Sequence, residues 1–384
     1  MANTALPAAS DTGRADWPDL LRALACLFIV AHHLAFYGPM SDAALPLAPD
    51  LMAWLYEHAR LAVQVFLVCA GFLVVPTLAR EPHLWPARVA RLLGRRFLRL
   101  AVPLWVVLAV WVVLAEAVRP GFAHESLSAT VGGAQALAHA FLLTHLLGHE
   151  ALSAGLWYVA IDLQLFALAL LLAALTRLGA CGPLRQHTAL LWQILVMALA
   201  LGSLLLWNRN AGLDNWGLYF FGAYGLGMLA WWTRQADGLQ RGMGWLTLLV
   251  LGALALWLEM RTRIALAWGV ALWLAWSPAL PAAWRTRAMP WVQALAHRSY
   301  ALFLVHFPVS VLVSALVLQW AGSAPWPNAL GMLASVIVSL LAAQALYRGV
   351  ECAAWRTRGW PLALLALALS VLLAQGLAQV LQRA

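Results

Sequence analysis

Residues 100–118, LAVPLWVVLAVWVVLAEAV, form an apolar run that a single acidic residue, Glu116, interrupts. A helix needs about 20 mainly apolar residues to cross a bilayer, so this run is long enough to span one. The whole chain shares this character, because 64% of its 384 residues are hydrophobic and 10% are charged. A soluble domain carries about 25% charged residues, and a chain of this size could not enclose so much apolar surface without lipid. The sequence therefore predicts an all-α polytopic membrane bundle.

Apolar runs of similar length recur on both sides of this segment. They predict about 10–11 spanning helices in a single domain covering 1–384, and we place eleven, near 20–37, 60–78, 100–118, 155–176, 188–207, 216–232, 244–258, 264–279, 299–319, 328–347 and 360–380. The runs at 244–258 and 264–279 are short, and we expect them to form either a tight hairpin or a partly re-entrant pair.

The arginines give this map an orientation. With the N-terminus in the cytoplasm, the cytoplasmic segments hold 18 arginines and the external segments hold six, as the positive-inside rule requires. Counting 135–148 as a span would invert every later loop and lose this bias, so we expect an external or re-entrant helix there. The net charge of +9 does not indicate nucleic acid, because the arginines lie in loops, where they contact anionic lipid or anionic substrates.

The first predicted span carries two ionisable residues on one helical face. Arg22 and His33 are eleven residues apart, which returns to within roughly 20° of the same face with a rise of about 16 Å. An imidazole held inside a membrane is a candidate general base. The alternative is that Arg22 only anchors the helix at the inner surface and His33 only hydrogen-bonds to another helix.

The segment before residue 100, ARVARLLGRRFLR (87–99), is rich in arginine. If it is helical, the arginines at three- and four-residue spacing form one cationic stripe with Arg96 beside it, namely Arg88, Arg91, Arg95 and Arg99. Guanidinium groups bind phosphates with two hydrogen bonds. The stripe therefore predicts a seat for a phosphate-bearing molecule from the cytosol, unless it serves only topology and contacts with anionic lipid.

Two later spans carry further polar groups. In LWYVAIDLQLF (156–166), Tyr158 and Asp162 share a face beside Trp157. A carboxylate inside an apolar run must pair with a cation or stay protonated, whereas the two aromatic residues could be interface anchors. In HRSYALFLVHFPV (297–309), Ser299 and His306 are seven residues apart and share a face. A His306 that only bonds to another helix is the alternative to a functional one.

Two close pairs of residues invite other interpretations. Arg348 and Glu351 are three residues apart at the inner end of a helix and are expected to form a structural ion pair. His145 and His149 have the spacing of helical metal ligands. Because Gly148 interrupts them and no further ligand set accompanies them, we predict no metal.

Six motifs in this chain occur in the order seen in the acyltransferase 3 family of integral-membrane acyltransferases, which they resemble. They are RALACLFIVAHH (22–33), VQVFLVCAGFLV (63–74), RRFLRLAVP (95–103), GLWYVAIDLQLF (155–166), SYALFLVHFPV (299–309) and YRGVE (347–351). The first matches the family's arginine, ten intervening residues and histidine, which selects His33 rather than His32. Ala70 stands where the family usually has serine, and Asp162 where it has glutamate.

The resemblance implies a function for the core at 19–351. It implies that the chain is a stand-alone O-acyltransferase of the bacterial cytoplasmic membrane, with 360–380 as an additional helix. Acyl-coenzyme A, most often acetyl, would dock from the cytosol on Arg22, Arg95, Arg96 and Arg99. His33 would act as general base, or the acyl group would pass through an acylated residue. His306 and Asp162 would assist catalysis, and a glycan or other hydroxyl acceptor would meet Trp157, Tyr158, Ser299 and Tyr300.

Other classes of protein also fit parts of the sequence. A transporter or exporter of a small or lipid-linked solute would account for the spans and the intramembrane histidines. It would not account for the arginine-rich segment or for the order of the motifs. A non-catalytic membrane assembly partner accounts least well for the polar groups. The acceptor, the acyl length and the oligomeric state remain open at this point.

Overall fold

The computed structural model describes residues 16–81, 83–178, 187–352 and 358–381, and within these ranges the chain is helical with no strand. The α-helices are α1 Asp16–Phe36, α2 Pro39–Ala44, α3 Pro49–His58, α4 Ala62–Ala79, α5 Pro86–Val118, α6 Gly133–Ala140, α7 Leu156–Leu178, α8 Thr188–Leu205, α9 Gly217–Gln235, α10 Gly238–Leu258, α11 Thr262–Trp276, α12 Ala282–Arg287, α13 Met289–Ala321, α14 Pro325–Leu346 and α15 Trp360–Leu381. A π-helical turn, η8 (Tyr347–Glu351), follows α14 directly.

The predicted polytopic helical bundle is confirmed. Nine segments of the described chain are long and apolar enough to cross a membrane, and a helix occupies each of the eleven expected positions. The two expected spans that are not among these nine segments are α9 and α11. With fifteen residues, α11 is short of a full crossing. α9 is long enough, but glycine and aromatic residues make it less apolar than the nine.

Helix α9 differs from the lipid-facing helices because it lies inside the bundle. Most of its residues are buried, and it packs against α4, α8 and α11. Its approach to α4 depends on two glycines: a Cβ on Gly71 would clash with the carbonyl of Tyr224, and a Cβ on Gly227 would clash with the carbonyl of Val68. Neighbouring helices shield α9 from lipid, so it does not need a continuous apolar surface.

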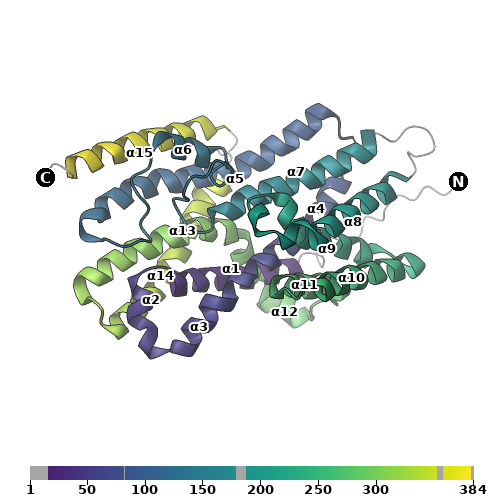
Figure 1. Cartoon of the computed structure of the whole chain (residues 1–384), viewed down its shortest axis with the longest axis horizontal. Helices are drawn as coiled ribbons and strands as arrows, with labels where there is room; N and C mark the ends of the chain where they lie inside the picture. Colours follow the sequence, from purple (N-terminus) through teal and green to yellow (C-terminus); the bar gives the residue numbers. More distant parts are fainter. Residues whose placement is uncertain (1–15, 82, 179–186, 353–357, 382–384) are drawn as a thin grey trace.

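The other long helices pack around this centre (Figure 1). α1 lies between α4 and α13, α13 and α14 form an antiparallel hairpin, and α15 packs along α5. In Figure 1, α5, α7 and α15 lie along the upper part of the molecule, and α8 to α11 gather at the right. Helix α1 is therefore central, and the residues along it face both α4 and α13.

Segment 135–148 contains only a short helix, which agrees with its exclusion from the spans. α6 has eight residues and ends at Ala140, and turns follow it. Its neighbourhood is tied to α15 by a hydrogen bond of 2.9 Å from the Gln375 side chain to the Val131 carbonyl oxygen. Eight residues rise about 12 Å as a helix, which is too little to cross a bilayer.

The hairpin α10–α11 resolves the short pair at 244–258 and 264–279. Helix α10 has 21 residues and is long enough to span, while α11 returns beside it and packs on α9. Arg261, in the connection, donates hydrogen bonds to the Asn208 side chain and the Leu204 carbonyl oxygen, at 2.7 and 2.8 Å. The connection is thus held against the end of α8.

Candidate functional site

Two histidines from opposite ends of the chain meet at the centre of the bundle. His33 Nδ1 lies 2.6 Å from His306 Nε2, although the residues are 273 positions apart. The two imidazole planes are nearly parallel, with ring centroids 4.9 Å apart. Helix α1 supplies His33 from its last turn, and α13 supplies His306, whose residue is 2% exposed.

The bonds around this pair define which nitrogens carry protons. His306 Nδ1 lies 3.1 Å from the carbonyl oxygen of Leu302, which can only accept, so Nδ1 must carry a proton. In the neutral imidazole, His306 Nε2 is then an acceptor, and it accepts the proton on His33 Nδ1. His33 Nε2 is therefore left with its lone pair, which is the state a general base requires.

The neighbouring histidine has a different environment. His32 Nδ1 lies 3.1 Å from the carbonyl oxygen of Leu55, at the helix α3 side of α1. Consecutive residues on a helix point about 100° apart, so only one of the two can face α13. The motif spacing selected His33, and His33 is the residue that meets His306.

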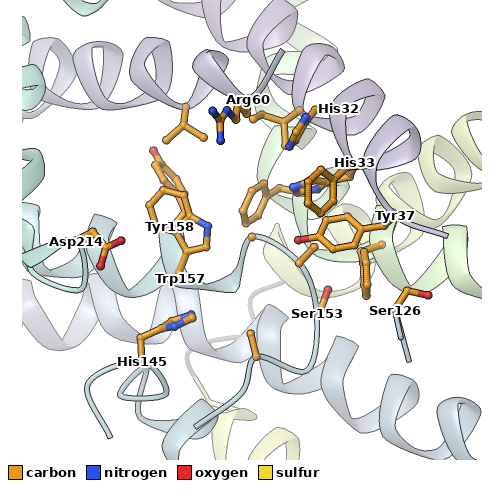
Figure 2. A pocket seen from close by; sticks show the side chains of 18 of the residues that line it. His32, His33, Tyr37, Arg60, Ser126, His145, Ser153, Trp157, Tyr158 and Asp214 are labelled. Atoms are coloured by element: carbon orange, nitrogen blue, oxygen red, sulfur yellow. The ribbon is translucent and has the colours of Figure 1, made fainter. Parts of the chain in front are cut away.

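A large cavity of about 950 Å³ opens beside His33 on the side where α1 ends. Figure 2 shows its side chains around a central space, with His33 and Tyr37 on one side and Trp157 and Asp214 on the other. We call it the outer cavity. Its charged residues are four acids and two arginines, namely Glu57, Glu125, Glu150, Asp214, Arg60 and Arg263. Its aromatic residues are Phe36, Tyr37, Tyr56, Trp157, Tyr158, Tyr219, Phe220, Phe303 and Phe307.

The wall of the outer cavity next to His33 is a loop, residues 150–155, whose backbone is held by hydrogen bonds to the side chains of Trp111 and His139. The indole of Trp111 donates to the Leu152 carbonyl oxygen at 2.7 Å, and the Leu152 N–H donates to His139 Nε2 at 3.1 Å. His139 Nδ1 lies 2.8 Å from the Gln135 carbonyl oxygen, so both nitrogens of this neutral ring are used. Burial lowers the pKa of His139 to about 4.

The same loop ends at Gly155, which lies against the histidine pair. Its φ is +81°, a conformation that favours glycine. A Cβ at this position would lie 2.8 Å from Phe303 Cζ and 3.5 Å from His33 Cε1. The absence of a side chain at Gly155 therefore lets the loop approach the point where Phe303 and His33 meet.

A second cavity of about 290 Å³ lies on the opposite side of the bundle, and we call it the inner cavity. Its charged residues are Arg22, Arg96, Arg99, Asp162 and Glu351. Apolar and aromatic side chains form the rest of its wall, among them Phe66, Ala70, Val74 and Phe166. The helix face that carries Arg22 and His33 thus contributes one residue to each cavity.

Asp162 pairs with Arg96 in the inner cavity. Arg96 Nε lies 3.1 Å from Oδ2 and its terminal nitrogen 2.7 Å from Oδ1, so both arms of the guanidinium contact the carboxylate. The side chains are 26% and 9% exposed, and the guanidinium also lies over the Phe166 ring, 5.4 Å from its centroid. The expectation that Asp162 pairs with a cation is confirmed. The same contact directs Arg96, which was expected beside the cationic stripe, toward Asp162.

Two side chains, Tyr158 and Phe303, line both cavities. Their rings meet edge to face at 5.7 Å, and Phe303 also lies 6.0 Å from the His306 ring. The residues come from α7 and α13. They form a septum between the cavities, and the histidine pair lies directly beside it.

The other predicted contact residues are distributed over this arrangement. Arg22 donates to the Ser299 hydroxyl at 3.3 Å and to the Ala296 carbonyl oxygen at 3.2 Å. The Tyr300 hydroxyl donates to the Leu100 carbonyl oxygen at 2.6 Å. Trp157 faces the outer cavity and stacks on Phe220, with centroids 5.4 Å apart. Ser299 and Tyr300 line the inner cavity instead, where they connect α13 to α1 and α5.

Two expectations differ from the structure. Arg95 is exposed on α5 and lines neither cavity, because one helical position separates it from Arg96, about 100° around the helix. Arg348 and Glu351 do not form the expected local pair: Arg348 is exposed, whereas Glu351 lines the inner cavity. The segment that holds both is the π-helical turn η8, in which the three-residue spacing of an α-helix no longer aligns side chains.

Several residues of the site carried no clear signal in the sequence. Glu57, Arg60 and Asp214 come from loops and short connecting helices, where charged residues are ordinary. Phe303 lies in an apolar run that any spanning helix would contain. Gly155 was a weak signal, because a glycine two residues before Trp157 suggests a close approach of the backbone.

The fold and the site define a polytopic membrane protein in which a pair of histidines lies beside the septum that separates two cavities. Among the described residues, no group of three or more His, Cys, Asp or Glu could hold a metal ion. The family model described as an acyltransferase domain, acyltransferase 3, matches residues 15–348, and the chain belongs to this family. Neither the curated proteins nor the solved structures contain a match to the chain. The protein is therefore a membrane acyltransferase.

Proposed function

We propose that this acyltransferase moves a short acyl group, acetyl in the simplest case, from acyl-coenzyme A in the inner cavity to a hydroxyl of a glycan in the outer cavity. One observation carries the proposal. His33 Nε2 holds a free lone pair beside the septum of Tyr158 and Phe303, where the two cavities meet. A base in that position serves an alcohol from one side and a thioester from the other.

The inner cavity supports the donor assignment. It carries three arginines against two carboxylates, and it lies where the arginine-rich start of α5 enters the bundle. Charge-assisted hydrogen bonds from guanidinium groups suit phosphates. Because Asp162 holds Arg96, we assign phosphate binding to Arg99 at the cavity edge and to Arg22 further in. The narrow, apolar remainder of the cavity favours a short acyl chain.

The outer cavity supports a polyhydroxylated acceptor. Carboxylates accept hydrogen bonds from sugar hydroxyls, and aromatic rings such as Trp157 cover the apolar faces of sugar rings. Both kinds of side chain line this cavity, together with Arg60 and Arg263. Its volume of about 950 Å³ is at the upper end of the range for small-molecule sites. A glycan end or a lipid-linked sugar fits this chemistry.

The reaction proceeds in one transfer. The acceptor oxygen attacks the thioester carbonyl carbon while His33 Nε2 takes the hydroxyl proton, which forms the new C–O bond. His306 stabilises the resulting imidazolium by accepting from His33 Nδ1–H. The tetrahedral intermediate collapses, the C–S bond breaks, and the proton on Nε2 passes to the leaving sulfur. Tyr158, whose side chain lines both cavities, donates its hydroxyl to the carbonyl oxygen as charge develops there.

The arrangement of the two cavities also favours direct transfer over a route through an acyl-enzyme intermediate. His33 lines the outer cavity, and the inner cavity begins on the other side of Tyr158 and Phe303, so donor and acceptor can be present together and direct transfer needs no covalent intermediate. A route through an acylated residue would show exchange of labelled coenzyme A into acyl-coenzyme A without acceptor. Direct transfer predicts that this exchange is absent until the acceptor is added.

The test uses purified protein in proteoliposomes with radiolabelled acetyl-coenzyme A and extracted surface glycan. His33→Ala should lower kcat roughly 10³-fold, because general-base catalysis contributes 10²- to 10⁴-fold. His32→Ala removes the same group one residue away; because His32 also lines the outer cavity, this variant can change the KM for the acceptor, but its kcat should stay near that of the wild type. Mass spectrometry of glycans from cells with either variant should lack the ester-linked acyl mass only for His33→Ala. Normal acylation by a folded His33→Ala protein would remove His33 from the mechanism.

A further inference from the structure

A third cavity lies between α13 and α14, apart from the two that flank the histidine pair. Its volume is about 220 Å³, and its walls are Trp291, Ala294, Leu295, Arg298, Leu302, Leu340, Ala343 and Gln344. None of these residues lines the outer or the inner cavity. The cavity is thus not an extension of the acyl-transfer site.

Two hydrogen-bond donors in this cavity have no acceptor. Arg298 Nε and Gln344 Nε2 are buried atoms that make no hydrogen bond with any residue the structure describes. Arg298 donates through another nitrogen to the Ala294 carbonyl oxygen at 2.8 Å and lies over the Tyr347 ring, 5.7 Å from its centroid. The cavity wall contains no acidic residue. A buried donor without an acceptor is costly, and a positive charge without a counter-charge is more so.

The remaining wall residues are apolar, and two of them face outward. Trp291 is 80% exposed and Leu340 is 38% exposed, on two helices that are long and apolar enough to span a membrane. In a bilayer such exposed apolar side chains contact lipid. The cavity therefore offers polar donors at its base and an apolar rim directed toward the acyl chains of the membrane.

The depth of the cavity matches a headgroup. Arg298 is the tenth residue of α13, about 14 Å along a helix that spans 33 residues. Gln344 lies two residues before the end of α14, and the hairpin brings this end back beside the start of α13. Both donors thus lie near the membrane surface on the side where α13 begins, which the arginine bias assigns to the cytoplasm.

We propose that this cavity binds the phosphate of an anionic glycerophospholipid. Arg298 Nε–H and Gln344 Nε2–H donate to the phosphate oxygens. The acyl chains lie along Leu340, one helical turn deeper in the membrane than Gln344, whereas Trp291, about 10 Å nearer the start of α13 than Arg298, lies at the level of the headgroup. Basic pockets between spanning helices on the cytoplasmic side are known to suit such headgroups. An anionic lipid fits better than a zwitterionic one, because the wall has no carboxylate to receive an ammonium group.

The experiment reconstitutes the full chain in nanodiscs of equal parts phosphatidylglycerol and phosphatidylcholine and counts retained lipid by native mass spectrometry. The wild type should retain phosphatidylglycerol in preference to phosphatidylcholine. A double variant, Arg298→Gln with Gln344→Leu, should retain at least fivefold less phosphatidylglycerol than the wild type. Arg241→Gln, which removes an exposed arginine of α10, should retain it. Equal retention by the wild type and a folded double variant would overturn the proposal.

Two further arms keep the test decisive. If the double variant does not fold, Ala294→Leu fills the cavity while leaving both donors in place, and it should also displace the lipid. Retention of phosphatidylglycerol by Ala294→Leu would overturn the site. Inorganic phosphate at millimolar concentration should not raise the melting temperature of delipidated protein, whereas phosphatidylglycerol should. Equal stabilisation by both would assign the site to a free anion and reject a lipid.

Discussion

The outer and inner cavities lie on either side of one septum, yet their walls differ in charge and size. The outer one, about 950 Å³, has four acidic residues and two arginines, with aromatic rings between them. The inner one, about 290 Å³, has three arginines and two acidic residues. An acid-lined, aromatic space suits a molecule with many hydroxyls, and a narrow basic space suits a phosphate-bearing one. The difference supports two substrates that arrive from opposite sides.

The polar pairs beside the two cavities also differ, because one is charged and the other is neutral. Arg96 and Asp162 form a charged pair that satisfies both partners. His33 and His306 form a neutral pair that leaves one lone pair unused. Within a membrane, a charged group needs a partner, whereas a neutral imidazole can be left with one unused acceptor at lower cost. The charged pair therefore holds the bundle together, and the neutral pair is available for chemistry.

The largest effect should follow from breaking the charged pair. Asp162→Asn leaves the Arg96 guanidinium in the inner cavity without a counter-charge. Removing one partner of a largely buried pair costs about 3 kcal/mol, so the apparent melting temperature in detergent should fall by several degrees. Replacing both partners, Arg96→Met with Asp162→Leu, should recover most of the loss. If Asp162→Asn is as stable as the wild type, the pair has no structural role.

Breaking the neutral pair should lower the catalytic rate more than it lowers the stability of the fold. His306→Phe keeps a ring but removes the acceptor for His33 Nδ1–H, so His33 can rotate or change tautomer. Misplacing a catalytic group can cost about 10²-fold, and we expect a 10- to 100-fold lower kcat with an unchanged KM for acyl-coenzyme A. His306→Gln places an oxygen near the Nε2 position and should retain most activity. Equal losses for both variants would contradict a positioning role.

Much of the fold followed from the sequence because the bilayer imposes a simple requirement. Each apolar run of about 20 residues must form a helix, and the expected helices are present. Two helices differ: α9 is covered by its neighbours, so the requirement for lipid contact is relaxed there, and α11 has only fifteen residues. The short helix α6 was also placed correctly, because the arginine bias excluded a span at 135–148.

The site was predictable in its parts but not in its pairings. The helical spacing placed Arg22 and His33 on one face of α1, and the motif spacing selected His33 rather than His32. They could not show that Arg96 meets Asp162, 66 residues away, because that contact depends on how α5 packs against α7. The local pair Arg348–Glu351 was wrong because a π-helical turn changed the spacing. Contacts between helices depend on packing that no single helix encodes.

A smaller effect should separate two neighbouring arginines of the α5 segment. Both arginines are exposed, but Arg99 lines the inner cavity and Arg95 lines neither cavity. Arg99→Gln should raise the KM for acyl-coenzyme A about tenfold, since a charged hydrogen bond to phosphate contributes about 1.5 kcal/mol at an open site. Arg95→Gln is the matched control and should change the KM less than twofold. Equal effects would show that the whole stripe, rather than the cavity, attracts the donor.

The smallest effect concerns the loop that supports the outer cavity, and it depends on pH. Because the pKa of His139 is lowered to about 4 from its ordinary value near 6.5, the unfolded chain takes up a proton before the folded protein does as the pH falls. His139 therefore stabilises the fold fully above about pH 6.5 and progressively less down to about pH 4. A shift of this size limits the loss to about 3 kcal/mol. Local opening of the loop, which breaks only the bond from Leu152 N–H to His139 Nε2, lets the ring take up its proton at a cost of about 1 kcal/mol, and we expect the loss to be near that lower figure.

Melting curves between pH 4.5 and 7.5 measure this contribution. The wild type should lose a few degrees more than His139→Phe over this range, because the variant lacks the titrating ring while keeping its shape. His145 and His149 face the same ring and titrate in both proteins, so the difference between the two curves isolates His139. Since the loop carries Gly155 to the histidine pair, the KM for the acceptor should rise over the same pH range, with the KM for acyl-coenzyme A unchanged. Parallel melting curves for the two proteins would show that this ring does not hold the loop, whose position would then depend on the bonds from Trp111 to the Leu152 carbonyl oxygen and from Gln135 to the Glu150 carbonyl oxygen.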